Sequence, residues 1–259
     1  MKFKYLLAAP AAFLTAGTCA QAAQLAALIG NDTIAIVDTD AKKVTKSMKV
    51  SGIGGPLVGI DVRPADGMLY GLVDDGTVVT IDTAGKATVK SKLETMLAKG
   101  VAATVDFNPV ADRLRVIGSD GTNLRANVDD GKVTKDGQLR FADGDINKGK
   151  SPKIVAGAYI NSVKGSKETG LFDIDAATGA LVKQAPPNDG ILNTVGMLGA
   201  KVDNVAFDIW SDGQGRNEAW AMAGRELWSI DLATGKATPA AKIDGVSGTV
   251  RDIAILPAM

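Results

Sequence analysis

Short runs of alternating apolar and polar residues recur along the chain, and Gly, Asp or Pro separates one run from the next. Four such runs follow one another in the clearest stretch: Val58–Val62, Met68–Val73, Val78–Asp82 and Ala87–Leu93. A period of two with many β-branched residues is typical of β-strands, and the links between these runs carry turn residues such as Asp-Gly. This stretch therefore predicts four short strands that form one small sheet.

One strand end recurs five times: an aliphatic residue followed by Asp, usually with Gly a few residues later. The five aspartates are Asp38, Asp82, Asp129, Asp175 and Asp231, at intervals of 44, 47, 46 and 56 residues. A four-stranded propeller blade takes about 40–50 residues. The pattern predicts an all-β fold, a single β-propeller of about five four-stranded blades, with a β-sandwich or a partly open sheet as the alternative.

The two ends of the chain complement each other. Leu25 begins a run that resembles the second strand of a blade, whereas residues 250–256 resemble the opening strands that contain Asp61, Asp106 and Asp208. We expect the C-terminal strand to complete the blade that the N-terminal strands begin. Such closure removes the unpaired strand edges that an open sheet would expose.

The first 22 residues have the features of a secretory signal peptide. Two lysines precede an apolar stretch, Tyr5–Ala16, and small residues lead up to Ala22, after which we expect cleavage, with the next bond as the alternative. The apolar stretch is shorter than the ~20 residues of a membrane-spanning helix. Cys19 leaves a lipoprotein as an alternative. The remainder, residues 23–259, is expected to be one domain in the periplasm or outside the cell, without membrane insertion after cleavage.

Composition narrows the chemistry of this mature chain. Residues 1–22 take away two lysines and the single cysteine, which leaves 27 basic and 29 acidic residues and a formal charge of −2. A nearly neutral protein has no electrostatic reason to bind nucleic acid. The chain has no histidine, so Ser-His-Asp and Cys-His catalysis and His-ligated zinc are excluded.

Two longer stretches resemble a known bacterial family. The runs Val105–Val116 (VDFNPVADRLRV) and Gln184–Gly196 (QAPPNDGILNTVG) are similar to the family called domain of unknown function 4394, and the likeness covers nearly all of the mature chain. The resemblance implies a propeller-like exported protein and carries over no catalytic residue.

The repeated aspartates offer two readings. Those at the five strand ends are expected to pin the following turn through their own downstream N–H groups, as Asp commonly does. A second series, Asp61, Asp106, Asp208 and Asp252, lies on the strands that we expect to be innermost, and Asn108 shares a face with Asp106. These side chains could line the central channel and hold a cation or a polar ligand, or they could cap loops and bond between blades.

Two further groups are candidates for ligand binding. Asp143, Asp145 and Asn147 place oxygen donors at alternate positions, as calcium loops do, but Lys148 and Ile154 stand where such a loop needs Gly and an acid. We therefore expect calcium to be at most a structural ligand, and no other cofactor.

Arginines concentrate in the third repeat, where Arg113 and Arg115 should share one face and could receive an anion or form salt bridges. The three tryptophans, Trp210, Trp220 and Trp228, fall in the last repeat, where packing between blades is the expected role and sugar or protein contact the alternative.

The stretch Gln184–Gly199 lacks strand periodicity and lies where the repeat interval widens. Two prolines stiffen it, and Asn188, Asp189 and Asn193 offer donors and acceptors. Long loops in compact domains are often functional, so this stretch is predicted to contact a ligand, unless it only closes the mouth of the propeller.

Together these features favour an exported, non-catalytic binding propeller that contacts a partner protein or a small ligand through loops at one face. The alternative is a metal-dependent, lactonase-like propeller hydrolase. A third reading is a structural component of a surface assembly. Only four glutamates are present, which gives a metal hydrolase few candidate bases.

Overall fold

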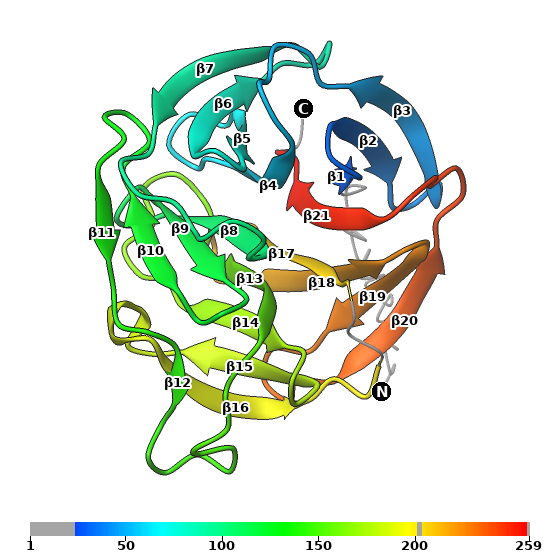
Figure 1. Ribbon diagram of the computed structural model, residues 1–259. Coiled ribbons are helices and arrows are strands. Elements are labelled where there is room, and N and C mark those ends of the chain that lie inside the picture. The colour runs from blue at the N-terminus through cyan, green and yellow to red at the C-terminus, as the bar shows by residue number, and fades with distance from the viewer. Residues whose placement is uncertain (1–23, 201–203, 258–259) are drawn as a thin grey trace, which may run out of the picture.

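The computed structural model describes residues 24–200 and 204–257. Their strands form five antiparallel sheets arranged as blades around one axis, which confirms the predicted five-bladed β-propeller (Figure 1). The predicted signal peptide lies outside the described residues. Within the described residues, no helix is long and apolar enough to cross a membrane.

In each blade the strands follow one another from the axis outwards. Blade 1 contains β21 (Val250–Ile255), β1 (Gln24–Ile29), β2 (Thr33–Asp38) and β3 (Lys43–Lys49). Blade 2 contains β4 (Leu57–Val62), β5 (Leu69–Val73), β6 (Thr77–Ile81) and β7 (Ala87–Lys92). Blade 3 contains β8 (Ala103–Asn108), β9 (Arg113–Gly118), β10 (Asn123–Ala126) and β11 (Val133–Lys135).

Blades 4 and 5 complete the ring. Blade 4 contains β13 (Ile154–Tyr159), β14 (Leu171–Asp175), β15 (Ala180–Gln184) and β16 (Ile191–Met197), and the short strand β12 (Arg140–Phe141) runs parallel to β16 as a fifth strand. Blade 5 contains β17 (Ala206–Ser211), β18 (Asn217–Ala223), β19 (Glu226–Ile230) and β20 (Ala237–Lys242).

The ring closes as predicted. β21 at the C-terminal end pairs with β1 at the N-terminal end, with Ala26 opposite Ala254 and Leu28 opposite Asp252. Both strands are almost entirely buried. The first blade is therefore assembled from both ends of the chain, so the ring has no open blade edge at this joint.

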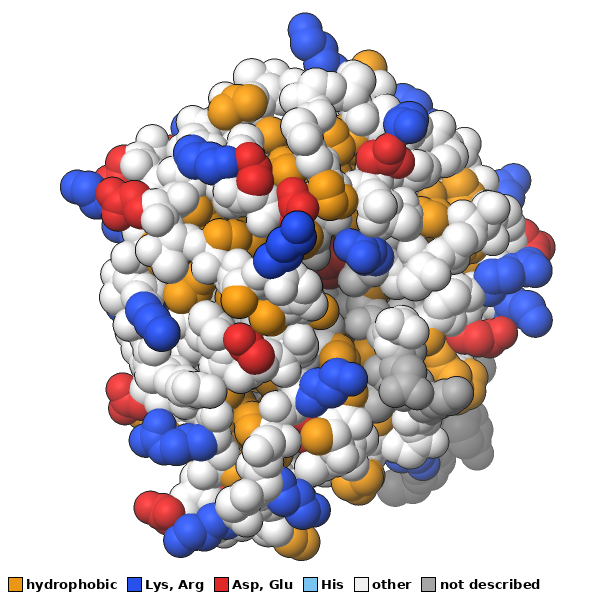
Figure 2. All heavy atoms as spheres, in the orientation of Figure 1, with side chains coloured by type: hydrophobic (Ala, Val, Ile, Leu, Met, Phe, Trp, Pro, Cys, Tyr) orange, Lys and Arg blue, Asp and Glu red, His pale blue; other side chains and the backbone are white. Residues whose placement is uncertain are grey.

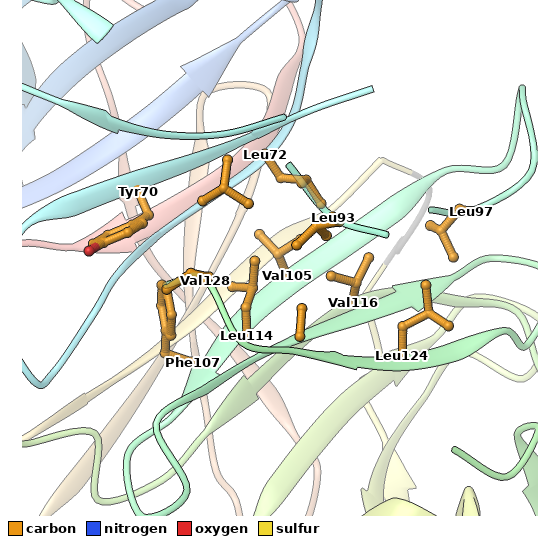
Figure 3. Close-up of a cluster of buried hydrophobic side chains, with 12 residues drawn as sticks. Tyr70, Leu72, Leu93, Leu97, Val105, Phe107, Leu114, Val116, Leu124 and Val128 are labelled. Carbon is orange, nitrogen blue, oxygen red and sulfur yellow. The ribbon is translucent and has the colours of Figure 1, made fainter. Parts of the chain in front are cut away.

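Apolar side chains between neighbouring blades form the core. Figure 3 shows the cluster between blades 2 and 3, where Leu72, Phe107 and Val116 are buried among aliphatic neighbours. The rings of Tyr70 and Phe107 meet edge to face, with centroids 5.2 Å apart. Trp210 and Trp220 pack in the cluster between blades 5 and 1, and Trp228 packs between blades 4 and 5, so all three tryptophans take the expected packing role.

A second kind of joint repeats at the outer rim. The turn between the third and fourth strands of each blade, or the start of the fourth strand, bonds to the chain just after the outer strand of the preceding blade. All five joints have such a backbone bond: Ser51 N–Gly85 O 2.9 Å, Glu94 N–Gly131 O 2.9 Å, Gly137 N–Asn188 O 2.8 Å, Ala237 N–Leu198 O 2.9 Å and Val44 N–Asp244 O 2.8 Å.

Two expectations about blade 4 were wrong. Asp175 ends the second strand of its blade, β14, whereas the other strand-end aspartates follow third strands. The stretch Gln184–Gly199 is not an inserted loop, because it contains the 3₁₀ turn η1 (Pro187–Asp189) and the whole of strand β16. β16 is only partly buried and carries polar residues, so its sequence lacks the apolar alternation that identifies an inner strand.

Candidate functional site

The five innermost strands, β21, β4, β8, β13 and β17, contact one another in a ring around the axis (Figure 1). Four of them carry the predicted inner aspartates: Asp252, Asp61, Asp106 and Asp208. The side chains of all four are at most 6% exposed. The prediction that this series lies on the innermost strands is therefore confirmed. A buried carboxylate needs hydrogen-bond donors or a counter-charge.

Each of these carboxylates accepts a hydrogen bond from the backbone of the next blade. Asp252 Oδ2 accepts from Ile60 N at 2.9 Å. Asp61 Oδ2 accepts from Phe107 N at 2.7 Å. Both bonds are buried and cross from one innermost strand to its neighbour, so they join blade 1 to blade 2 and blade 2 to blade 3.

The same contact joins two further pairs of blades. Asp106 Oδ1 accepts from Tyr159 N at 3.0 Å, and Asp208 Oδ2 accepts from Ile255 N at 2.6 Å. The innermost strand of blade 4, β13, has the sequence IVAGAY and carries no carboxylate. Blade 4 therefore lacks the bridging carboxylate.

Blades 4 and 5 use other groups. Ser211 Oγ accepts from Ser162 N at 2.9 Å, and Asn217 Oδ1 accepts from Asn161 N at 2.8 Å. These contacts lie at the ends of β13 and β17. The four inner aspartates thus form hydrogen bonds between blades at four joints. This is one of the two roles that the sequence predicted for them.

Three of the four carboxylates also converge. Asp61, Asp106 and Asp208 each offer an oxygen, and these oxygens lie within 4.8 Å of one another. Oxygens that share a calcium ion lie about 2.3–2.6 Å from it and hence up to about 5 Å apart. The spacing and the oxygen donors fit a hard cation, the other reading of the sequence.

The electrostatics of this group follow from its burial. Loss of solvation raises the pKa of Asp61 and Asp106 well above the usual Asp value, and repulsion from the neighbouring carboxylates raises it further. Burial raises the pKa of Asp208 to about 6, although its two backbone N–H bonds oppose that rise. Protons or a cation must therefore neutralise part of the charge at the axis.

Asn108 and Arg113 lie at the turn that follows the inner strand of blade 3. Asn108 Oδ1 accepts from Val110 N and Ala111 N, both at 2.9 Å, and so pins the turn. Arg113 donates to the carbonyl oxygens of Ala111 and Asp112. Both side chains stabilise the turn, and the structure does not bring them together with the axial carboxylates.

Arg115 and Asn188, which were separate candidates, are in contact. Arg115 Nη2 donates to Asn188 Oδ1 at 2.8 Å across the boundary between blades 3 and 4. Asp189 is exposed, and its carbonyl oxygen accepts from Arg140 at 3.1 Å. Asn193 Nδ2 donates to Ala185 O at 3.1 Å within the same hairpin.

The calcium-like stretch does not converge. Asp145 accepts from the Thr194 hydroxyl at 2.8 Å and from its N–H, and Asn147 Nδ2 donates to the same hydroxyl at 2.9 Å. The Asp143 carboxylate is exposed and pairs with Lys148 at 3.0 Å. These groups connect the chain after β12 to β16.

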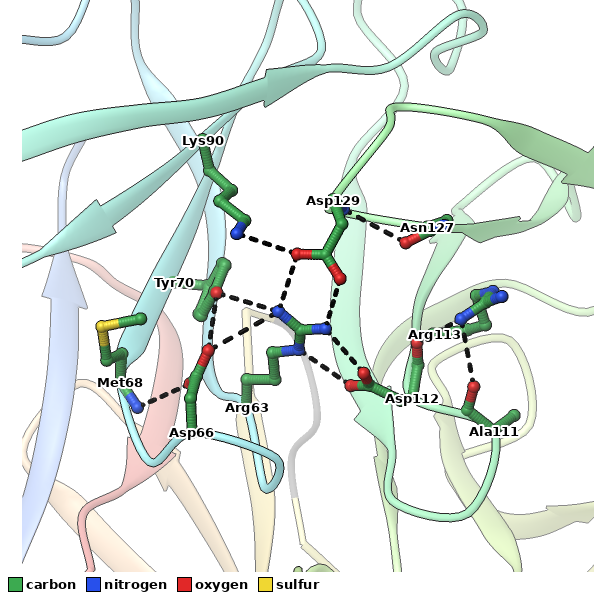
Figure 4. A network of polar contacts seen from close by, with 10 residues as sticks. All are labelled: Arg63, Asp66, Met68, Tyr70, Lys90, Ala111, Asp112, Arg113, Asn127 and Asp129. Carbon is green, nitrogen blue, oxygen red and sulfur yellow. Dashed lines mark hydrogen bonds and ion pairs between the residues drawn. The ribbon is translucent and has the colours of Figure 1, made fainter.

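Sequence reasoning missed a network around Arg63 (Figure 4). Arg63 donates Nε to Asp112 Oδ1 at 2.8 Å and Nη2 to Asp112 Oδ2 at 2.6 Å, a bidentate pair, and it also bonds to Asp129 at 2.8 Å. Lys90 completes the network at 2.8 Å from Asp129. The guanidinium and the ammonium hold the pKa of Asp129 well below its usual range.

This network corrects the reading of Asp129 as a turn-pinning residue. Asp38, Asp82 and Asp231 do accept from N–H groups in the turns that follow them. In the equivalent turn of blade 3, Asn127 Oδ1 accepts from Asp129 N at 3.1 Å. Because Asn127 bonds to this turn, the Asp129 carboxylate is free to bond to Arg63 of blade 2. An Asn two residues before the Asp was therefore the feature of the sequence that could have indicated a different role for Asp129.

The fold and its axis define a class of protein: a five-bladed β-propeller whose innermost strands are joined by buried carboxylates. The chain belongs to the family described as "Domain of unknown function (DUF4394)", whose model matches residues 33–254. No curated protein matches it.

The solved structures to which this chain is similar are distant in sequence. A protein of unknown function from Bacteroides thetaiotaomicron VPI-5482 shares 16% identity at a TM-score of 0.52, over 90% of this chain and 64% of that one. This chain thus spans less than two thirds of that protein's length. A protein of unknown function from Bacteroides caccae shares 12% identity at a TM-score of 0.47, over 92% of this chain and all of that one.

Proposed function

We propose that this protein is an exported, non-catalytic binding propeller that holds its partner at the mouth formed by the loops that follow the innermost strands. The observation that carries the proposal is the loop Ile160–Gly170 between β13 and β14. The corresponding loops of blades 2, 3 and 5 are short: Arg63–Met68, Pro109–Asp112 and Asp212–Arg216. The long loop breaks the symmetry of the ring at one place.

The loop is held in a defined shape at its base. Besides the two backbone bonds to Ser211 and Asn217, Ser166 Oγ donates to Asn161 O at 2.5 Å and to Val163 O at 2.9 Å. Loops fixed by the scaffold lose little entropy on binding, which favours recognition. Its tip presents the exposed side chains of Lys164 and Lys167.

The converging carboxylates lie beneath this mouth. Asp61, Asp106 and Asp208 stand one to three residues before the ends of their strands, which is within about 10 Å at ~3.3 Å per residue. Figure 2 shows the opposite face of the ring, where the innermost strands begin, and that face is hollowed near its centre. A partner that enters the mouth meets a basic loop at the rim and acidic groups below.

Export rests on the N-terminal segment described above, and it would place the mouth in the periplasm or outside the cell. The absence of cysteine from residues 23–259 is compatible with either place, because a fold without thiols is indifferent to redox conditions.

A charge reversal tests the binding mouth. The variant Lys164→Glu with Lys167→Glu changes the loop tip, and the variant Lys132→Glu with Lys135→Glu makes the same charge change at the outer rim of blade 3. Each immobilised mature protein is incubated with an envelope extract of the source organism. We expect a partner that wild type and the rim variant retain and the loop variant loses, at unchanged melting temperatures. If all three proteins retain the partner equally, the loop tip at the mouth is not the contact face.

The metal-dependent hydrolase is a second candidate because the convergence of Asp61, Asp106 and Asp208 favours metal binding. Two points favour a structural cation over a catalytic one. The carboxylates are 5–6% exposed, and they already accept backbone N–H bonds from neighbouring blades. Calorimetric titration of the chelated mature protein with Ca²⁺ and Zn²⁺, beside Asp106→Asn, tests this, and metal-dependent hydrolysis of a lactone or ester that Asp106→Asn abolishes would favour the enzyme.

A further inference from the structure

The boundary between blades 3 and 4 contains a buried arginine. Arg115 lies at its centre and is 2% exposed. Its guanidinium donates to the Tyr159 hydroxyl at 3.1 Å, Asn123 Oδ1 at 2.8 Å, Asp136 Oδ2 at 2.6 Å and Asn188 Oδ1 at 2.8 Å. One buried cation thus connects the inner strand of blade 4 to the hairpin at its outer side.

Asp173 on β14 lies in the same boundary and is completely buried. Neither of its carboxylate oxygens has a hydrogen-bond partner among the described residues. It stands opposite Gly157 of β13, where an added Cβ would overlap Asp173 Oδ1. The cavity lined by Gly157, Arg115 and Asp106 has no room for a water molecule. Asp173 is therefore a buried acid without hydrogen-bond donors, next to a cavity too small for water.

The charged groups packed against this site are already engaged. Asp106 on β8 accepts from Tyr159 N, and the hydroxyl of Tyr159 is bonded to Arg115. Asp136 is paired with Arg115 at 2.6 Å. Asp175, two residues further along β14, accepts from Lys153 N. Arg115 is the one group that lowers the pKa of Asp173, whereas burial raises that pKa to about 8.

A neutral carboxyl fits this place, but a carboxylate does not. A buried anion without donors or water is strongly disfavoured. When the proton leaves for solvent, the carboxylate must gain a donor. Either Arg115 turns toward it and gives up some of its present partners, or the blades separate enough to admit water.

We propose that the boundary between blades 3 and 4 is a proton-operated latch, closed while Asp173 is protonated and loosened when the proton leaves. Asn188 is held by Arg115, and Gly137 N donates to Asn188 O at 2.8 Å. Arg115 also bonds to Asn123, whose Nδ2 donates to Pro187 O at 3.0 Å, so loss of Arg115 loosens the hairpin Gln184–Gly190 from the end of blade 3 at both Asn188 and Pro187. The other four joints keep their contacts.

Linkage fixes the signature of such a latch. If Asp173 titrates near 8 when closed and near the ordinary value of 3.8 when open, opening releases one proton throughout that interval. The opening constant then rises about tenfold for each pH unit between these values and levels off above pH ~8.

Amide hydrogen exchange of the mature protein between pH 5 and pH 9 tests the latch. The reporters are the amides of Gly137 and Arg140, which bond across to Asn188 O and Gly190 O. The internal reference is the amide of Ser51, which makes the same kind of bond to Gly85 O between blades 1 and 2. Protection factors divide out the intrinsic effect of pH on exchange.

We expect protection at Gly137 and Arg140 to fall about tenfold per pH unit up to pH ~8, faster than at Ser51. Asp173→Asn keeps the shape of the side chain but cannot ionise. In this variant the tenfold loss of protection per pH unit at Gly137 and Arg140 should disappear. Parallel changes at all three amides, or an unchanged slope in Asp173→Asn, would overturn the proposal. The carboxyl-carbon NMR titration of Asp173 in wild type decides the case if the variant does not fold, because a midpoint near 4 would also overturn it.

Discussion

The axial carboxylates should make the protein more stable in mild acid than at neutral pH, and Asp208→Asn isolates one contribution. Asp208 is buried at the joint between blades 5 and 1, where it accepts from Ile255 N and Ile209 N, both at 2.6 Å. Its pKa is about 6 in the fold against 3.8 for an ordinary Asp. A raised acid pKa means that the folded state holds its proton more tightly than the unfolded chain does.

The sign follows from that difference. The stability is fully present below pH 3.8 and is lost as the pH rises through 6. A difference of about two pKa units corresponds to about 3 kcal/mol, of which about 2.5 kcal/mol are lost between pH 4 and pH 7.5. The amide in Asp208→Asn cannot ionise, so the variant escapes this loss, although it gives up one acceptor oxygen at every pH.

Urea unfolding of the chelated mature proteins at pH 4, 5, 6 and 7.5 measures the effect. The free energy of unfolding of the variant relative to wild type should rise by about 2.5 kcal/mol across this range, and more if Asp61 and Asp106 ionise more easily without their neighbour. Asp231→Asn is the control, because the turn N–H groups lower the pKa of that exposed Asp and its pH dependence has the opposite sign. A relative free energy that stays constant within about 0.5 kcal/mol would refute the reasoning.

Four further results are expected. Deletion of residues 250–259 removes β21 and should lower both the melting temperature and the solubility, and equal values would contradict the closed ring. Arg63→Lys cannot form the bidentate pair and should cost about 1–2 kcal/mol in urea unfolding, whereas no loss would make the network incidental. Calcium titration of the chelated protein should be the same in Asp145→Ala as in wild type, and micromolar affinity lost in that variant would restore the loop as a calcium site. Mass spectrometry of the protein from its source should find Ala23 as the first residue, and an intact Met1 or a lipid on Cys19 would refute the predicted processing.

Much of the fold could be predicted because its signals are local. The runs from Val58 to Leu93 alternate with a period of two and are separated by Asp-Gly turns, and each became a strand of blade 2. Ring closure could be predicted because residues 250–256 resemble an innermost strand with no second strand after it, whereas the run from Leu25 resembles a second strand with no innermost strand before it. The outer strand β16 could not, because a half-exposed strand needs no apolar alternation.

The site was less predictable because its partners come from other blades. The sequence shows that Asp106 and Arg115 lie on inner strands of one repeat, but not that Asp106 meets a backbone N–H of blade 4 or that Arg115 meets Asn188. Asp173 carries no sequence signal of burial, since Leu-Phe-Asp-Ile-Asp also suits a half-exposed strand. The glycine at position 157 is the related feature of the sequence, because a side chain there would overlap Asp173. Its meaning is clear only when the strand register, which places Gly157 opposite Asp173, is known.

Blade 4 is where the ring departs from its own repeat. It has a fifth strand, a long loop at the mouth, an innermost strand without a carboxylate, and a buried acid without donors. An unpaired buried acid lowers stability, and such departures concentrate where a protein does more than fold. The two proposals place both activities in this blade, yet they separate experimentally. Charge reversal at Lys164 and Lys167 should leave the pH dependence of exchange at Gly137 intact, whereas Asp173→Asn should remove it without changing partner capture below pH 6.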